Sequence, residues 1–195
     1  MMDNMASAAL DLRDIPLDRQ RHLRREEYEK LVGLGIFEHE RVELLYGVIV
    51  QMTPIGPSHC DAVDRLAELL ILALSGRARV RIQGSFAASD DSEPEPDVAV
   101  YPLRDYSSGH PDSAHLIIEV AQSSLHEDRG TKAQLYAEAG VPEYWIVNLV
   151  DQVVELHRKP EGGKYTQVST ARKGESLQIE SFPDVVFSVG RILPP

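Results

Sequence analysis

The sequence has very little cysteine: Cys60 is the single one among 195 residues. One cysteine cannot form an internal disulfide, and it cannot build a cysteine-rich zinc site. Long apolar runs are also missing, because no stretch approaches the ~20 residues needed to cross a bilayer and the N-terminus lacks the apolar segment of a secretory signal. We therefore expect a cytoplasmic protein with no membrane association.

Positive charge is scarce as well. Lys and Arg number 20 against 31 Asp and Glu, which gives a formal net charge of −11. This balance argues against non-specific attraction to nucleic acid, which needs a basic face. Two short basic clusters, residues 19–25 and 77–81, are candidate phosphate contacts, although ordinary solvated charges explain them at least as well.

The sequence contains no glycine-rich phosphate loop of the Walker or Rossmann type and no Ser-His-Asp or Cys-His nucleophile arrangement. Hydrophobic residues make up 43% and charged residues 26% of the chain, as is typical of a globular protein. The length favours a single domain. We place that domain at residues 21–195, after a flexible N-terminal arm at residues 1–20.

Periodicity and turn residues predict an α+β fold with a β-rich C-terminal part. The second predicted helix opens with Ser58 as its cap, runs to about Ser75 and has Gly76 as its C-cap. One predicted strand, residues 43–52, has a hairpin break at Tyr46-Gly47 as an alternative. The predicted helices are residues 24–33, 58–75 and 128–140, and the other predicted strands are residues 78–82, 98–101, 116–120, 143–147, 153–157, 165–168, 177–179 and 185–187.

The chain is organised around residues 96–148, where two apolar runs are followed by a helix and a third apolar run. Strands that alternate with a helix of this length predict a βαβ unit in a mostly buried sheet. Glu119 lies inside the second run. An unpaired charge there is strongly destabilising, so we expect a compensating partner for Glu119.

Asp97 opens the first of these strands, about twenty residues before Glu119. If the two strands are neighbours, the carboxylates converge at one sheet edge, and paired oxygen ligands suit Mg²⁺ or Mn²⁺. Lys132 lies on the following helix, four residues after Asp128 and on the same face. Two carboxylates, a metal and a lysine are a working set for phosphodiester hydrolysis.

At these residues the chain resembles the Uma-type restriction endonucleases of the PD-(D/E)xK nuclease superfamily. The resemblance runs from about Tyr28 to the C-terminus. Its motifs are Glu-Pro-Asp-Val-Ala-Val at 95–100, Ile-Glu-Val at 118–120, Asp-Arg-Gly-Thr-Lys at 128–132 and Tyr-Ala-Glu-Ala-Gly-Val-Pro-Glu-Tyr-Trp-Ile-Val at 136–147, with Arg-Val-Glu-Leu at 41–44, Gly-Val-Ile at 47–49 and Pro-Ser-His at 57–59.

The resemblance implies a restriction-endonuclease-like mixed β-sheet flanked by helices, and a divalent-metal-dependent endonuclease that hydrolyses DNA. It implies that Asp97, Glu119 and the Val120 carbonyl bind the metal. The superfamily lysine two residues after the glutamate is replaced here by Ala121, so the resemblance assigns its role to Lys132.

The resemblance also gives Glu43 as an additional carboxylate and His59 as a general acid or base, or as a structural residue. Duplex-cutting nucleases often match the twofold symmetry of their substrate, so we expect a homodimer.

Simpler interpretations stand beside these. Asp97 could cap a strand or turn, and Glu119 could form a structural ion pair with Lys132 without a metal. Asp128 is interpreted as a charge at a helix N-terminus rather than as a ligand. Tyr144 and Trp145 are interpreted as core residues.

Two functional alternatives to a nuclease remain open. The first is a non-catalytic interaction protein that retains the nuclease fold, which the missing lysine and the acidic balance favour. The second is a metal hydrolase for a small phosphorylated substrate, which would tolerate an acidic surface better.

Overall fold

A six-stranded mixed sheet forms the centre of the protein, which a computed structural model describes over residues 19–194. The strand order is β3 (Ala78–Ile82), β4 (Val98–Pro102), β5 (Leu116–Ala121), β6 (Glu143–Asn148), β7 (Val153–Glu161) and β8 (Lys164–Arg172). β5 and β6 are parallel, and the other neighbouring pairs are antiparallel. The predicted βαβ unit and the predicted α+β class are therefore confirmed.

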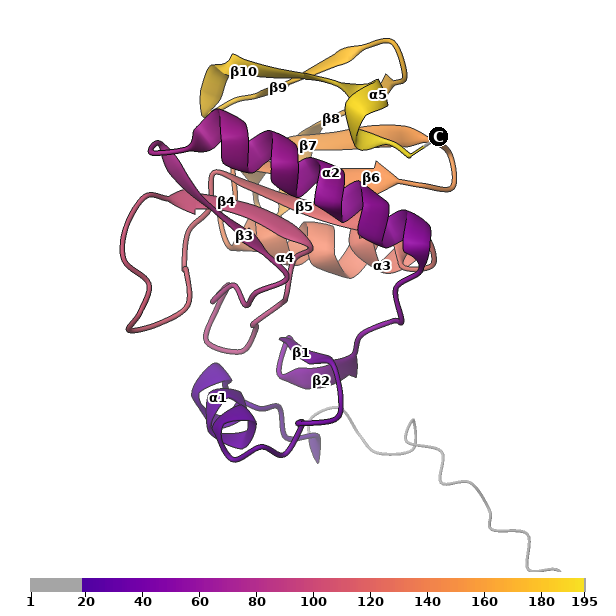
Figure 1. Ribbon diagram of the computed structural model, residues 1–195. Coiled ribbons are helices and arrows are strands. Elements are labelled where there is room, and N and C mark those ends of the chain that lie inside the picture. Colours follow the sequence, from indigo (N-terminus) through magenta and orange to yellow (C-terminus); the bar gives the residue numbers. More distant parts are fainter. Residues whose placement is uncertain (1–18, 195) are drawn as a thin grey trace, which may run out of the picture.

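The strands β4, β5 and β6 are apolar almost throughout because both faces of the sheet are covered. α2 (Pro57–Leu74) crosses one face, as Figure 1 shows, and packs on residues such as Val100 and Ile118. The hairpin of β9 (Ser176–Ile179) and β10 (Phe182–Ser188) and the short helix α5 (Val189–Ile192) complete that layer. The predicted β-rich C-terminal part is thus present.

The opposite face carries one helical segment in three parts: α3 (Leu125–Glu127), the π-helical turn η3 (Asp128–Lys132) and α4 (Ala133–Glu138). Leu135 and Tyr136 of α4 pack there against Ile117 and Ile146. The predicted helix over residues 128–140 therefore starts three residues early and is interrupted by a wider turn. Tyr144 and Trp145 lie at 0% exposure, so their interpretation as core residues is confirmed.

A smaller unit lies at one end of the sheet and consists of α1 (Arg25–Gly33) and the antiparallel hairpin of β1 (Val42–Leu45) and β2 (Val48–Gln51) (Figure 1). Tyr46 and Gly47 both have positive φ, as a two-residue hairpin turn requires. A Cβ atom on Gly47 would lie 2.4 Å from the His22 Cβ, so a side chain does not fit. The alternative of a break at Tyr46-Gly47 is the correct one.

Helix α2 begins differently from the prediction. Gly56 is its N-cap and Pro57 its first residue, so Ser58 lies inside the first turn and does not cap it. Proline fits there because the first helical N–H has no partner within the helix. The helix ends at Leu74, and Gly76 follows with a φ of +73°. None of the described helices is long and apolar enough to span a membrane.

The boundary between arm and domain stays a prediction. Nearly all of the proposed arm, residues 1–20, lies outside the described residues.

The packing of α2 on the sheet gives a stability prediction. Leu70 is fully buried in this layer, whereas Leu72 on the same helix is 72% exposed. Leu70→Ala should lower the free energy of unfolding by about 2–5 kcal/mol, because it removes buried methyl groups and leaves a cavity. The matched Leu72→Ala should change it by less than about 0.5 kcal/mol. Urea unfolding followed by circular dichroism measures both, and equal losses would contradict this packing.

Candidate active site

The site is centred on Glu119, whose side chain is buried in the middle of the sheet. Side chains alternate along β5, so Glu119 faces the same side as Ile117 and Ala121, toward the helical segment α3–η3–α4. Only 4% of Glu119 is exposed. The compensating partner that the sequence demands must therefore come from that side.

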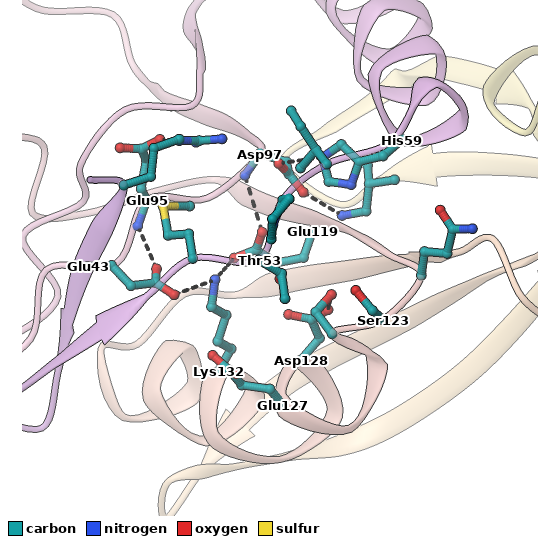
Figure 2. Close-up of a pocket in the computed structure, with 18 of the residues that line it drawn as sticks. Glu43, Thr53, His59, Glu95, Asp97, Glu119, Ser123, Glu127, Asp128 and Lys132 are labelled. Atoms are coloured by element: carbon teal, nitrogen blue, oxygen red, sulfur yellow. Dashed lines mark hydrogen bonds and ion pairs between the residues drawn. The ribbon is translucent and has the colours of Figure 1, made fainter. Parts of the chain in front are cut away.

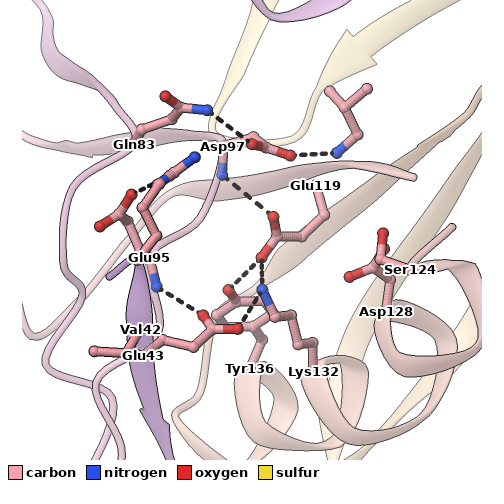
Figure 3. Close-up of polar contacts among 12 residues, drawn as sticks. Val42, Glu43, Gln83, Glu95, Asp97, Glu119, Ser124, Asp128, Lys132 and Tyr136 are labelled. Atoms are coloured by element: carbon pink, nitrogen blue, oxygen red, sulfur yellow. Dashed lines mark hydrogen bonds and ion pairs between the residues drawn. The ribbon is translucent and has the colours of Figure 1, made fainter. Parts of the chain in front are cut away.

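Three donors from the chain meet the Glu119 carboxylate (Figure 3). Lys132 Nζ lies 3.1 Å from Oε1, and the Tyr136 hydroxyl donates to the same oxygen at 2.7 Å. The backbone N–H of Asp97 donates to Oε2 at 3.2 Å. Lys132 ends the π-helical turn and Tyr136 is four residues later, so one face of the helix supplies both side chains.

Lys132 bridges two carboxylates. Its Nζ is also 3.1 Å from Oε1 of Glu43, which β1 carries in from the smaller unit. That hairpin is held in place by paired backbone hydrogen bonds between Leu44 and Glu93, at 3.3 and 2.7 Å. The backbone N–H of Glu95 donates to Glu43 Oε2 at 3.0 Å and fixes the other end of the carboxylate.

Asp97 precedes β4 and is bound at both of its oxygens. Oδ2 accepts the Val120 N–H at 2.9 Å, which ties the start of β4 to β5. Oδ1 lies 2.9 Å from Nε2 of His59, in the first turn of α2, and accepts a weaker hydrogen bond from Gln83 at 3.4 Å. Asp97 and His59 are both buried.

These side chains line a single pocket of about 100 Å³ (Figure 2). The structure thus brings together every site residue expected from the sequence: Glu43, His59, Asp97, Glu119, Val120 and Lys132. The loop between β2 and α2 also lines the pocket, with Thr53 among its residues (Figure 2).

Burial and neighbouring charges together shift the pKa values of Glu119 and Lys132. Burial strongly raises the pKa of Glu119, as do the charges of Asp97, Asp128 and Glu43, while Lys132 acts in the opposite direction. Burial alone would lower the pKa of the Lys132 amine, but the surrounding carboxylates outweigh it and raise that pKa. Lys132 is therefore a protonated cation at neutral pH.

Sequence reasoning underrated two residues. Asp128, which the sequence suggested as a charge at a helix N-terminus, is 2% exposed, lines the pocket and accepts a hydrogen bond from Ser124 Oγ at 2.7 Å. Tyr136 had no assigned role, yet it donates the shortest hydrogen bond to Glu119. Both residues lie four positions from Lys132, and that spacing was the available signal.

Within residues 19–194, no three His, Cys, Asp or Glu side chains lie close enough together to hold a metal ion by themselves. A divalent ion at this pocket would therefore need backbone carbonyls or water in addition to side-chain ligands.

Comparison with known proteins identifies the family of this chain. The model of the Uma2 family, described as "Putative restriction endonuclease", matches residues 25–190. This chain belongs to the Uma2 family. The match includes β1, the helical segment and every residue of the pocket described above.

A solved structure supports the fold of this family member. The crystal structure of a protein described as a putative nuclease from Anabaena variabilis ATCC 29413 superimposes with a TM-score of 0.67 at 16% sequence identity. The similarity covers 87% of this chain and 97% of that chain. The predicted restriction-endonuclease-like sheet with flanking helices is confirmed. No curated protein matches the sequence significantly.

The bridge formed by Lys132 predicts a pH-dependent loss of stability. Because Glu119 titrates at a raised pKa in the folded chain, its contribution to stability is present at low pH and is lost as the pH rises through that pKa. Lys132 limits this loss. Lys132→Met should therefore lower the free energy of unfolding by about 3–5 kcal/mol at pH 8, and by clearly less at pH 5.

Urea unfolding at the two pH values measures the difference. The control is Lys30→Met, which removes an exposed lysine at the end of α1 and should change stability little at either pH. A loss for Lys132→Met that does not depend on pH would contradict a charge-compensating role.

Proposed function

We propose that the protein is a divalent-metal-dependent endonuclease that hydrolyses DNA phosphodiester bonds. The observation that supports this most is the meeting of Asp97, Glu119 and Lys132 in one pocket, although they are far apart in the sequence. Membership of a restriction endonuclease family agrees with the proposal.

The residues present fit a divalent cation. Oε1 of Glu119 already accepts two hydrogen bonds, but Oε2 accepts one, and Oδ2 of Asp97 also accepts one. Each of these two oxygens therefore retains a lone pair, since a carboxylate oxygen accepts about two bonds. Four buried carboxylates, those of Glu43, Asp97, Glu119 and Asp128, also line this pocket, which contains one lysine, Lys132.

Val120 can contribute its backbone carbonyl. Its N–H points to Asp97, which lies just before the start of β4. The N–H and C=O of a strand residue point to the same side, so the Val120 carbonyl is directed toward Asp97 as well. In the proposed site, Asp97, Glu119 and the Val120 carbonyl hold Mg²⁺ or Mn²⁺. When bound, the ion polarises the phosphoryl group and lowers the pKa of water.

The other residues position and compensate these ligands. Lys132 forms an ion pair with both Glu119 and Glu43 and so offsets the repulsion between them. Its positive charge also stabilises negative charge on the phosphoryl group during the reaction. His59 orients Asp97 through Nε2, so we assign it a positioning role.

DNA binding by this acidic chain relies on local rather than net charge. Several arginines of the two basic clusters are already paired: Arg77 forms two hydrogen bonds with Asp184, and Arg25 pairs with Glu29. We therefore propose that the ion at the pocket supplies much of the attraction for the scissile phosphate, and that a homodimer presents two such pockets to a duplex.

A non-catalytic interaction protein is the second candidate. The closed ion-pair network of Lys132 with Glu43 and Glu119 favours it, because this network is satisfied without a metal.

Cleavage of plasmid DNA tests the leading proposal. Purified protein with Mg²⁺ or Mn²⁺ should nick or linearise the plasmid, and chelation with EDTA should abolish the reaction. Asp97→Asn and Lys132→Ala should each lower the rate by roughly 10²-fold or more. Asp64→Asn, which changes an exposed aspartate on α2, is the control and should leave the rate unchanged. Cleavage that survives both site substitutions would remove these residues from the mechanism.

Metal binding separates the two candidate functions. In calorimetric titration with Mn²⁺, the nuclease predicts a binding heat that Glu119→Gln abolishes and that Glu26→Gln, at an exposed position on α1, retains. A wild-type protein that binds no Mn²⁺ would favour the interaction protein.

A further inference from the structure

Asp128 is one of the four buried carboxylates at the pocket, and the ligand set proposed above does not use it. It is the first residue of η3, and its backbone N–H bonds to the Ser124 carbonyl at 3.0 Å. Its side chain lies among the residues that line the pocket (Figure 2), and 2% of the residue is exposed. A carboxylate this deeply buried is normally paired with a cation.

Only one of the two Asp128 oxygens has a partner. Oδ2 accepts the hydrogen bond from Ser124 Oγ at 2.7 Å. Between residues 19 and 194, no hydrogen bond or ion pair reaches Oδ1, and Lys132 Nζ is instead bound to Glu43 and Glu119. Oδ1 is therefore an acceptor at a pocket wall whose partner must come from outside the chain, from water or substrate.

The surroundings of Asp128 raise the pKa of its carboxyl group toward neutral pH. Burial and the charges of Asp97 and Glu127 raise the pKa of Asp128 to about 6, while the Ser124 hydrogen bond and the Lys132 charge act to lower it. Glu119 on β5 and Tyr144 on β6 also face this carboxylate, since its charge raises the pKa of each. Asp128 is thus ionised at pH 7 but still basic enough to accept a proton.

Other groups at the pocket are less suited to that role. Lys132 is protonated and has no lone pair to accept a proton. His59 has its Nε2 bound to Asp97. Asp128 is also not a third direct metal ligand in this arrangement, because the described residues contain no cluster of three such groups.

We propose that Asp128 is the general base of the hydrolysis, with Oδ1 accepting the proton of the attacking water. This inference rests on the nuclease function proposed above. The water O–H bond breaks and its proton moves to Asp128, while the water oxygen forms a bond to phosphorus. The bond from phosphorus to the leaving ester oxygen breaks, and solvent protonates that oxygen. Ser124 positions Asp128 through Oδ2.

The test measures single-turnover cleavage of a DNA duplex from pH 5 to 9, with Mn²⁺ saturation verified by calorimetry at each pH. Asp128→Asn keeps the side-chain shape and should lower the rate at pH 7.5 by about 10²–10⁴-fold, with Mn²⁺ affinity within roughly threefold of wild type. The matched control Glu127→Gln removes a neighbouring charge at the same pocket and should change the rate by less than about threefold.

Ser124→Ala supplies a second measurement. The wild-type rate should fall as the pH drops through the pKa of Asp128, and this acid limb should be absent from the residual activity of Asp128→Asn. Because the Ser124 hydrogen bond lowers the pKa of Asp128, Ser124→Ala should move the acid limb to higher pH.

The outcomes separate this inference from the proposed function. If wild-type protein binds Mn²⁺ and cleaves DNA but Asp128→Asn does so at the same rate, the base assignment is wrong and the nuclease stands. Loss of Mn²⁺ binding in Asp128→Asn would make Asp128 a ligand and also overturn it, as would an acid limb that Ser124→Ala does not move. A wild-type protein that cleaves no DNA overturns both proposals.

Discussion

The burial of Glu119 in the central sheet is the constraint on which the rest of the structure depends. A carboxylate in the middle of β5, between apolar neighbours and under a helix, is stable only if donors surround it. Lys132, Tyr136 and the Asp97 N–H provide them. Lys132 belongs to η3, Tyr136 to α4, and Asp97 directly precedes β4. This one carboxylate therefore ties these three elements together.

The same constraint extends to the smaller unit. Lys132 also contacts Glu43, so the β1–β2 hairpin is joined to the helix through a buried ion pair as well as through its backbone bonds to residues 91–93. The pocket therefore lies where three parts of the fold meet: the central strands β4 and β5, the helical segment and the hairpin. A site assembled in this way needs the complete fold before any of its chemistry is available.

An excess of carboxylates over cations explains how an acidic chain can fit a phosphodiester substrate. Glu43, Asp97, Glu119 and Asp128 are buried near one lysine, and such an arrangement is costly without a further positive charge. A divalent cation would relieve the repulsion and at the same time create the local positive potential that a phosphate requires. These carboxylates contribute to the net charge of −11, so in this proposal the positive charge at the site comes from the ion and not from the surface of the chain.

Much of the fold could be predicted from the sequence, because its local signals agree with one another. The apolar runs at β4, β5 and β6 are long enough to be buried strands, and the helix between β5 and β6 fixes their parallel direction. The pairing of Asp97 with Glu119 followed from the expectation that their strands are neighbours, which the register of Val98 with Ile118 confirms.

The details of the site could not be predicted, because they depend on tertiary contacts. Asp128 and Lys132 are the buried residues of a π-helical turn, and periodicity alone does not reveal such a turn. The approach of Glu43 depends on the docking of a hairpin from a distant part of the chain. Helix α2 starts at Pro57 although Ser58 is also a common N-cap residue. The residue pattern alone does not tell which of these two start signals prevails.

One measurement tests the central claim most directly: an anomalous difference map from crystals of the protein soaked in Mn²⁺. The proposal predicts a single strong peak between the carboxylates of Asp97 and Glu119, within coordination distance of the Val120 carbonyl, with Lys132 still bound to Glu119. A pocket that contains no peak at saturating Mn²⁺, with every ion pair of Lys132 unchanged, would contradict the metal-dependent nuclease.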